Sequence, residues 1–442
     1  MKQKPPGYWD LTRYFAPLAL QAASQAFSYP LVAMVASRGP GGTANLAGLA
    51  QSNIVLFFIG VVGLGLVTTG MVYGRTRQGF DNFFKLTLQI GAFCSLVQVL
   101  LCTPVLSRLL FGSIIGLPPN IEAPANLTLM ATIPLQFLFF LRVPYQVALY
   151  NGHETGKASI ATIVRIIFTA LLSFICCMAG WVGPIWAVIC LTLPVALEVA
   201  GSWFLSRRLI QDLVFSAESP PRIWEIFKFN LPLSIGGYFL ALVGIIIGGF
   251  IARAPDPERM MPVFYLALGL VSPVAYAATR LQAVAIGFLP AISPRDNTII
   301  RFTVFSGLVF GLLPLLFILP GMVHLYYVKL QQLASADIGL IRLTAFSLVI
   351  YPVGVAIRSY WEGMAALDKK PFSVLAGQAA FMATVLTSAF ISLYLGAEGY
   401  LIGAIALTIG GFMSAWVTKH VLRYGKKVSI PVPQTVTSCV QK

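Results

Sequence analysis

Three arginines lie deep inside long apolar stretches of the chain, and they are the residues best suited to carry chemistry: Arg142, Arg280 and Arg358. A charged side chain in an apolar span is costly, so it usually faces a cavity or an oppositely charged partner. Guanidinium groups stay charged and bind carboxylates and phosphates through paired hydrogen bonds. If the three side chains converge, they predict a binding site for anions, and we include Glu362 in it.

These charged residues also have plainer interpretations. Arg142 and Arg358 lie in the last third of their stretches, from which a long side chain can extend to the membrane surface. Arg358 and Glu362 are four residues apart, a spacing at which two helix residues neutralise each other. Arg165 lies near a helix start and suits a structural role, and Glu198 could pair with it. The sequence leaves these alternatives open.

A stripe of polar side chains follows one face of the first apolar stretch. Gln21, Ser24, Gln25 and Ser28 have the spacing that places residues on one side of a helix. Such a stripe can line a water-filled cavity, or it can join neighbouring helices by hydrogen bonds. We favour the cavity because the stripe is long, and we assign Gln21, Gln25 and Ser28 to substrate binding.

The sequence offers no pattern for a metal, a cofactor or an enzymatic reaction. The three histidines stand alone, and the six cysteines lack the spacing of metal ligands. We find no nucleotide-binding motif and no catalytic triad. We therefore expect a protein that is not an enzyme, uses no cofactor, and moves its substrate by exchange, passively, or with a proton or sodium gradient as the driving force.

The composition predicts that a lipid bilayer surrounds most of the chain. Of its 442 residues, 57% are hydrophobic and only 10% are charged, whereas soluble domains carry about 25% charged residues. The mean hydropathy is +0.82. The net charge of +15 would suggest a nucleic-acid partner in a soluble protein. Here the basic residues lie in short loops, so we expect no nucleic-acid binding.

About twelve apolar stretches are long enough to cross a membrane as helices. In the first half they cover residues 11–36, 46–72, 83–106, 125–150, 158–180 and 184–209. In the second half they cover residues 224–252, 263–288, 299–320, 337–364, 372–395 and 400–422. A polar segment rich in proline and serine separates the two sets, which indicates a linker.

The two halves of the sequence resemble each other. Trp9 and Pro17 recur as Trp224 and Pro232 at one constant offset, and the Arg142 and Arg358 positions correspond at nearly the same offset. The sequence therefore predicts an all-α, multi-pass membrane protein with two pseudo-symmetric six-helix bundles. We place the first bundle at residues 1–212, a cytoplasmic linker at 213–222, the second bundle at 223–425 and a short tail at 426–442.

Lysine and arginine are far more frequent in the loops on one side of the predicted spans than on the other. The side of a membrane protein that is rich in these residues is usually cytoplasmic. We therefore expect both chain termini in the cytoplasm, and we expect the protein in the inner (cell) membrane.

Short motifs along the chain resemble the multidrug/oligosaccharidyl-lipid/polysaccharide (MOP) exporter superfamily, and within it most closely the progressive ankylosis (ANK) family. The similarity covers most of the chain. The matching residues are Tyr8-Trp9, Arg13, Pro17-Leu18, Gly48-Leu49-Ala50, Phe57-Phe58, Pro273-Val274, Pro290-Ala291, Pro352-Val353, Arg358, Gly363, Lys369-Lys370 and Phe372.

This resemblance implies the fold of the multidrug and toxic compound extrusion (MATE) proteins and an alternating-access carrier that exports polyanions. Citrate, ATP and pyrophosphate leave cells through the vertebrate member. Arg358 matches an arginine of the family, whereas Arg142 and Arg280 do not. Ala26 and Tyr29 stand where the family carries acidic residues, and the long acidic tail of animal members is missing, which suggests a prokaryotic homologue.

Three functions are consistent with these observations. The first is export of a small anionic substrate of the citrate, nucleotide or pyrophosphate kind through a central cavity lined by arginines. The second is a flippase for a lipid-linked oligosaccharide or another pyrophosphate-containing lipid. The third is a cation-coupled multidrug antiporter, which needs carboxylates embedded in the membrane to bind cations. We rank it last because only Glu198 and Glu362 lie away from the ends of the predicted spans, and both have arginines nearby.

Overall fold

The computed structural model describes residues 6–25, 28–215, 219–288, 297–325 and 337–424, and every regular element in these ranges is a helix. Pro290-Ala291, Ala26 and the predicted tail 426–442 lie outside the described residues. The helices of the first half are α1 Tyr8–Ser24, α2 Ser28–Ser37, α3 Thr43–Gly60, η2 Val61–Gly63, α4 Leu66–Tyr73, α5 Arg77–Leu101, α6 Pro104–Ser107, η3 Arg108–Ile114, α7 Pro119–Ala131, α8 Ile133–Asn151, α9 Thr155–Met178 and α10 Pro184–Gln211.

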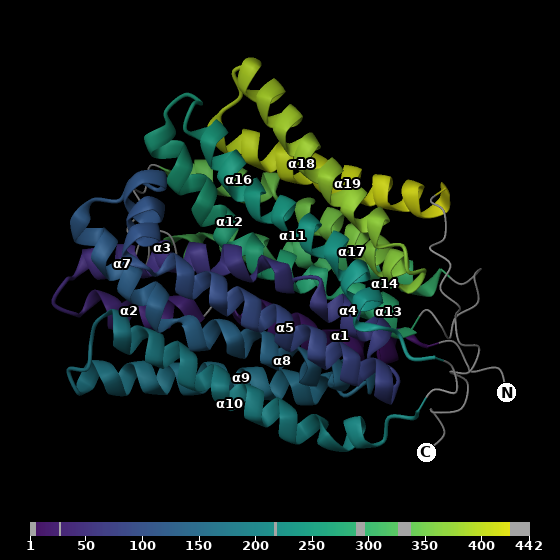
Figure 1. Ribbon diagram of the computed structural model, residues 1–442. Coiled ribbons are helices and arrows are strands. Elements are labelled where there is room, and N and C mark those ends of the chain that lie inside the picture. The colour runs from purple at the N-terminus through teal and green to yellow at the C-terminus, as the bar shows by residue number, and fades with distance from the viewer. Residues whose placement is uncertain (1–5, 26–27, 216–218, 289–296, 326–336, 425–442) are drawn as a thin grey trace.

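The second half of the chain repeats this succession of long helices. Its helices are α11 Ile223–Ile251, α12 Pro257–Thr279, α13 Leu281–Phe288, α14 Thr298–Leu312, η5 Leu313–Ile318, α15 Pro320–Val323, α16 Ile338–Ser347, α17 Tyr351–Leu367, α18 Pro371–Tyr394 and α19 Gly399–Tyr424. Figure 1 shows the purple to blue helices of the first half gathered on one side and the green to yellow helices of the second half on the other.

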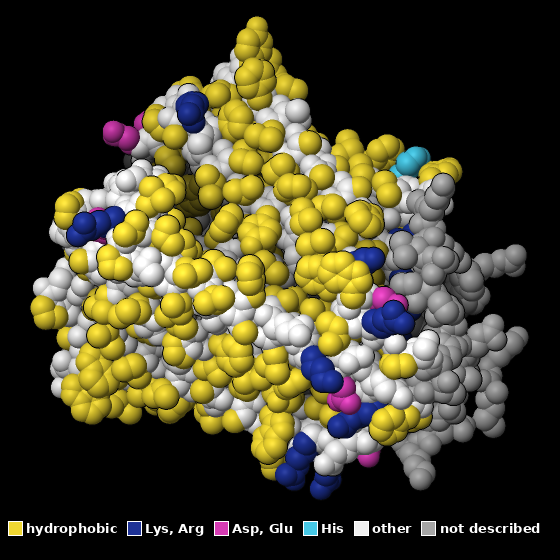
Figure 2. All heavy atoms as spheres, in the orientation of Figure 1, with side chains coloured by type: hydrophobic (Ala, Val, Ile, Leu, Met, Phe, Trp, Pro, Cys, Tyr) yellow, Lys and Arg dark blue, Asp and Glu magenta, His cyan; other side chains and the backbone are white. Residues whose placement is uncertain are grey.

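Among the described residues, eleven helices are long and apolar enough to cross a membrane, and a bent pair makes a twelfth. The bent pair is Pro119–Ala131 with Ile133–Asn151, which meet at 41°. Hydrophobic side chains cover most of the face in Figure 2, and charged ones gather toward the two ends of the helices. This confirms the predicted all-α, multi-pass membrane protein of two pseudo-symmetric six-helix bundles.

Two of the spans that carry arginines are interrupted. The fourth span bends at Thr132, two residues before Pro134, and Arg142 lies further along in α8. Proline has no backbone N–H to donate, so a helix interrupts readily there. The eighth span breaks between α12 and α13, and Arg280 is the residue at that junction. Neither break was predicted from the apolar pattern, because hydropathy does not register a change of helix direction.

The two halves pack together at the end of the molecule that holds the start of α1 and the end of α19, which we name the terminal end (Figure 1). Across this interface α1 packs against α12, α13 and α14, and α4 packs against α11, α13 and α17. Aromatic pairs reinforce it, including Phe15 with Phe302 and Tyr73 with Phe229. Figure 2 shows the surface hollowed toward the opposite end. The structure is therefore closed at the terminal end.

Close helix packing at Gly311 supports one stability prediction. A Cβ added at Gly311 would lie 2.1 Å from the carbonyl oxygen of Val349, a backbone atom that cannot rotate away. We expect Gly311→Ala to lower the free energy of unfolding by about 1–3 kcal/mol, the usual cost of overpacking, in a detergent-based unfolding titration. Gly269→Ala is the matched control, because a Cβ there meets nothing within 4 Å. Equal stability of both variants would contradict the packing described.

Candidate functional site

Three helices of the first half bring charged side chains together near the middle of their spans. Glu198 of α10 is 1% exposed and lies between Arg142 of α8 and Arg165 of α9. Arg142 donates from Nη1 to Glu198 Oε2 at 2.9 Å, and Arg165 Nε lies 3.5 Å from the same oxygen. The predicted pairing of Glu198 with Arg165 is confirmed. We name these three residues the charged centre.

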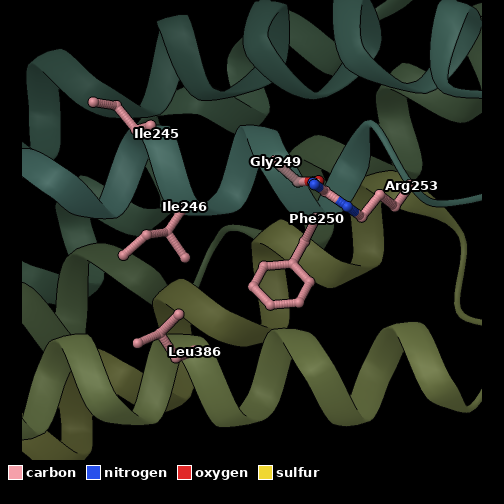
Figure 3. Close-up of a pocket in the computed structure, with 6 residues that line it drawn as sticks. All are labelled: Ile245, Ile246, Gly249, Phe250, Arg253 and Leu386. Carbon is pink, nitrogen blue, oxygen red and sulfur yellow. The ribbon is translucent and has the colours of Figure 1, made fainter.

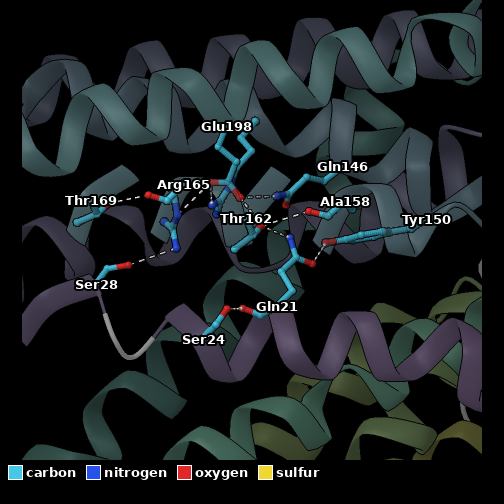
Figure 4. A network of polar contacts seen from close by, with 11 residues as sticks. Gln21, Ser24, Ser28, Gln146, Tyr150, Ala158, Thr162, Arg165, Thr169 and Glu198 are labelled. Atoms are coloured by element: carbon cyan, nitrogen blue, oxygen red, sulfur yellow. Dashed lines mark hydrogen bonds and ion pairs between the residues drawn. The ribbon is translucent and has the colours of Figure 1, made fainter. Parts of the chain in front are cut away.

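Polar neighbours complete the hydrogen bonding of the Glu198 carboxylate. Thr162 lies one turn before Arg165 on α9 and donates a short hydrogen bond to Glu198 Oε1. Gln146 Nε2 donates to the same oxygen at 3.3 Å. Gln21 of α1 donates to the Thr162 hydroxyl at 2.9 Å and accepts from the Tyr150 hydroxyl at 2.8 Å. Figure 4 shows this network running from α10 through α9 to α1.

The charged centre carries more positive than negative charge. Two guanidinium groups face one carboxylate, and the buried Nε atoms of Arg142 and Arg165 make no hydrogen bond within the part of the chain that the structure describes. Arg165 Nη2 donates to the Ser28 hydroxyl at 3.4 Å. Buried polar donors are normally satisfied, so unused N–H groups beside unbalanced positive charge favour an anionic ligand.

Arg280 comes from the second half of the chain. It lies at the junction of α12 and α13, and α13 packs against α8. The Nε of Arg280 is buried and makes no hydrogen bond with the residues that the structure describes. The structure thus places Arg280 at the start of a second-half helix that contacts α8, the helix that carries Arg142.

Arg358 makes a separate pair in the second half. Its Nε lies 3.6 Å from Glu362 Oε1 on the same helix, α17, and both side chains are less than 10% exposed. Gln378 of α18 donates to Glu362 at 3.1 Å, and the Arg358 guanidinium lies 5.2 Å from the centroid of the Phe381 ring. One arginine faces one glutamate here, so this pair is close to electrically neutral.

The polar stripe of the first span contributes hydrogen bonds between helices. Gln21 and Ser28 bond to α9 through Thr162 and Arg165, and both are buried. Ser24 is also buried and donates to the carbonyl oxygen of Gln21. Gln25 is half-buried at the end of α1. Two of these residues therefore join the site by supporting its charged members.

The sequence interpretation missed three members of the network: Gln146, Tyr150 and Thr162. Arg142, Gln146 and Tyr150 follow one another at intervals of four residues, so they share one face of α8. This spacing could have identified Gln146 and Tyr150 as neighbours of Arg142 in the site. Thr162 carried no comparable signal, because its contact with Glu198 depends on how α9 packs against α10.

A shallow groove elsewhere does not belong to this centre. It has a volume of about 300 Å³ and lies between α11 and α18, lined by apolar side chains and Arg253 (Figure 3). Arg253, in the turn that follows α11, donates to the carbonyl oxygen of Gly249 in that helix at 2.6 Å. Among the described residues, no group of three or more His, Cys, Asp or Glu side chains could hold a metal ion.

The overall fold is similar to that of solved MATE transporters, one of which is described as a member of the MOP superfamily. A Vibrio cholerae MATE transporter, VcmN, studied as an Asp-to-Asn mutant, is 17% identical with a TM-score of 0.73, covering 94% of this chain and 97% of its own. An outward-facing multidrug resistance MATE transporter and a Pyrococcus furiosus MOP transporter are each 15% identical with TM-scores of 0.72, covering 94% of this chain and 95% of theirs.

No protein-family profile and no curated protein sequence matches the chain. The similar structures nonetheless confirm the predicted MATE-like fold, and they are transporters rather than enzymes. The closer resemblance to the ANK family and a prokaryotic origin stay predictions.

Proposed function

We propose that this protein is an alternating-access transporter that exports small organic or inorganic polyanions, such as citrate-like acids, nucleotides or pyrophosphate. The observation that carries the proposal is the excess positive charge of the charged centre. Arg280 of the second half adds to it, because it lies at the start of α13, which packs against α8. A ligand between the two halves would contact arginines on both. Binding energy of this kind favours one arrangement of the halves over another, as alternating access requires.

One similar structure is a precedent for this fold with a binding pocket of changed polarity. The Pyrococcus furiosus relative is described as having a binding pocket of reverse polarity that suggests a different function. In the present chain the two buried glutamates, Glu198 and Glu362, each face an arginine. A carboxylate held in this way is poorly placed to bind a coupling cation, and the surplus arginine charge favours anions.

We further propose that the terminal end faces the cytoplasm of a cell whose inner membrane holds the protein. The richer supply of lysine and arginine on that side supports this orientation. The closed terminal end would then correspond to an outward-facing state. A similar structure was itself obtained in an outward-facing conformation.

A second candidate is a cation-coupled multidrug antiporter. The fold favours it, because similar structures include a multidrug resistance transporter of the MATE family. Proton or sodium coupling would then have to use Glu198 or Glu362, in competition with Arg142, Arg165 or Arg358. A flippase for pyrophosphate-containing lipids is the third candidate, since the same arginines would suit its head group.

The test is transport of labelled citrate, ATP and pyrophosphate in proteoliposomes, with and without imposed proton or sodium gradients. We expect saturable movement of at least one anion, and we expect Arg280→Ala to reduce its rate at least tenfold, equivalent to about 1.4 kcal/mol. Arg253→Ala is the matched control, because Arg253 lies in the groove between α11 and α18. We expect this variant to transport the anion at the wild-type rate.

Three other results would overturn the proposal in distinguishable ways. Transport of cationic drugs in exchange for protons or sodium ions, with no anion movement, would favour the antiporter. Movement of a labelled pyrophosphate-linked lipid between leaflets would favour the flippase. Equal anion transport by Arg280→Ala and the wild type would remove Arg280 from the site.

A further inference from the structure

A cluster of three rings joins the two halves at the terminal end. Tyr14 of α1 and Phe288 of α13 meet edge to face with ring centroids 5.2 Å apart. The imidazole of His153, in the loop between α8 and α9, lies 5.2 Å from the Tyr14 ring and 4.9 Å from the Phe288 ring. Tyr14 and His153 belong to the first half and Phe288 to the second, so the cluster spans the interface.

A second cluster reproduces this arrangement with the halves exchanged. Phe229 of α11 and Tyr73 of α4 meet edge to face, also with centroids 5.2 Å apart. The ammonium group of Lys369, in the loop between α17 and α18, lies 5.3 Å from the centroid of the Tyr73 ring. Here two members come from the second half and one from the first.

The two clusters occupy equivalent positions in the internal repeat. The offset that relates Trp9 to Trp224 also relates Tyr14 to Phe229 and Tyr73 to Phe288, and the offset of Arg142 and Arg358 relates His153 to Lys369. Each member of one cluster therefore has its counterpart in the other, although the counterpart of the His153 ring is the Lys369 ammonium group. The two clusters are therefore equivalent contacts, related by the pseudo-symmetry, in the interface between the halves.

His153 and Lys369 share an unusual backbone conformation. Both are non-glycine residues in the left-handed region, with φ of 56° and 54°. Each donates its backbone N–H three residues back, His153 to Tyr150 at 3.1 Å and Lys369 to Ala366 at 3.0 Å. Side chains larger than glycine tolerate this conformation only where the surroundings enforce it.

We propose that these two clusters are latches that hold the terminal end closed, and that protonation of His153 releases one of them. We name them the histidine latch (Tyr14, His153, Phe288) and the lysine latch (Phe229, Lys369, Tyr73). The proposal goes beyond the transport function proposed above and does not depend on which substrate is carried.

The surroundings of His153 give the sign of the pH dependence. The titratable and charged groups that face it among the described residues are Tyr14 from α1 and Arg75 from the loop between α4 and α5. Arg75 itself donates to the carbonyl oxygen of Ile286 in the second half at 2.8 Å. The adjacent Glu154 is paired with Lys157.

Burial lowers the pKa of His153 from its ordinary value of 6.5, and the nearby charge of Arg75 lowers it further. The neutral form is therefore favoured while the latch is closed. Opening separates His153 from Phe288 and lets it bind a proton more readily. Closure is thus most stable above about pH 6.5 and weakens as the pH falls through and below that value. Lysine does not titrate in this pH range, so a change of pH within it should not affect the lysine latch.

Distance measurements between spin labels test the proposal directly. We would label Arg207→Cys of α10 and Arg423→Cys of α19, both exposed and near the terminal end, in a chain whose native cysteines are replaced. In lipid nanodiscs, the fraction of molecules with a long distance between labels should rise at least about twofold between pH 8 and pH 5.5. His153→Asn should abolish this dependence, because asparagine does not titrate and tolerates the left-handed backbone.

An absent pH response in the wild type, or an unchanged one in His153→Asn, would overturn the proposal.

If the cysteine-free chain does not fold, hydrogen–deuterium exchange of Leu281–Phe288 gives a label-free comparison. Wild type and His153→Asn are compared at the same pH, which removes the effect of pH on exchange chemistry. At pH 5.5, exchange faster in the wild type than in the variant supports the latch. Equal rates at pH 5.5 overturn it.

Discussion

Replacing Glu198 by alanine is expected to lower the free energy of unfolding by about 3–5 kcal/mol, the cost of breaking a buried ion pair by removing one partner. The substitution leaves Arg142 and Arg165 facing each other without their shared carboxylate. It also removes the acceptor for Thr162 and Gln146. The measurement is a denaturant or detergent unfolding curve of the purified protein, followed by circular dichroism.

Glu362→Ala is the matched control for this prediction. Glu362 is buried to a similar degree, but it faces one arginine and one glutamine instead of two arginines. We therefore expect a smaller loss than for Glu198→Ala. Glu198→Gln should fall between the wild type and Glu198→Ala, because the amide keeps an acceptor for Thr162. A Glu198→Ala protein as stable as the wild type would show that the two arginines need no counter-charge.

The second large effect is expected on transport from Arg142→Gln. This change leaves Glu198 balanced by Arg165 alone, so the charged centre loses its surplus positive charge. The anion concentration for half-maximal transport should rise at least tenfold, which corresponds to about 1.4 kcal/mol of binding free energy. Arg142→Lys should have a smaller effect, because it keeps the charge and loses the paired geometry of the guanidinium.

Arg207→Gln serves as the control for Arg142→Gln, since Arg207 is exposed at the end of α10. It removes the same charge from the chain without touching the centre. A comparable loss of anion affinity in both variants would mean that the general positive potential of the protein attracts the substrate. An unchanged affinity in Arg142→Gln would place the binding site elsewhere.

The spans were predictable because hydropathy is a local property of the chain. The stretch predicted at residues 184–209 is the helix Pro184–Gln211, and that at 372–395 is Pro371–Tyr394. The bend at Thr132 and the break at Arg280 could not be predicted in this way, because the mean hydropathy stays high across both sites and does not register a change of helix direction. The repeat also indicated two similar bundles before any helix was placed.

The composition of the site was predicted only in part. Arg142, Gln21 and Ser28 were singled out because polar side chains are rare within spans, and the structure connects all three to the charged centre. Glu198 was matched to Arg165, but its stronger contact with Arg142 depends on the packing of α8 against α10. Contacts between helices distant in sequence carry no local signal. The two latches consist of such contacts, so the sequence did not predict them.

The unequal charge of the two halves has a consequence for the response to membrane voltage. The second-half pair is balanced, whereas the first-half centre keeps surplus positive charge while empty. Moving one elementary charge through a potential of 100 mV changes the free energy by about 2.3 kcal/mol. Reorientation of the empty carrier should therefore be electrogenic, while a bound anion would cancel part of that charge. The electrical gradient would then act most strongly on the return step of the cycle.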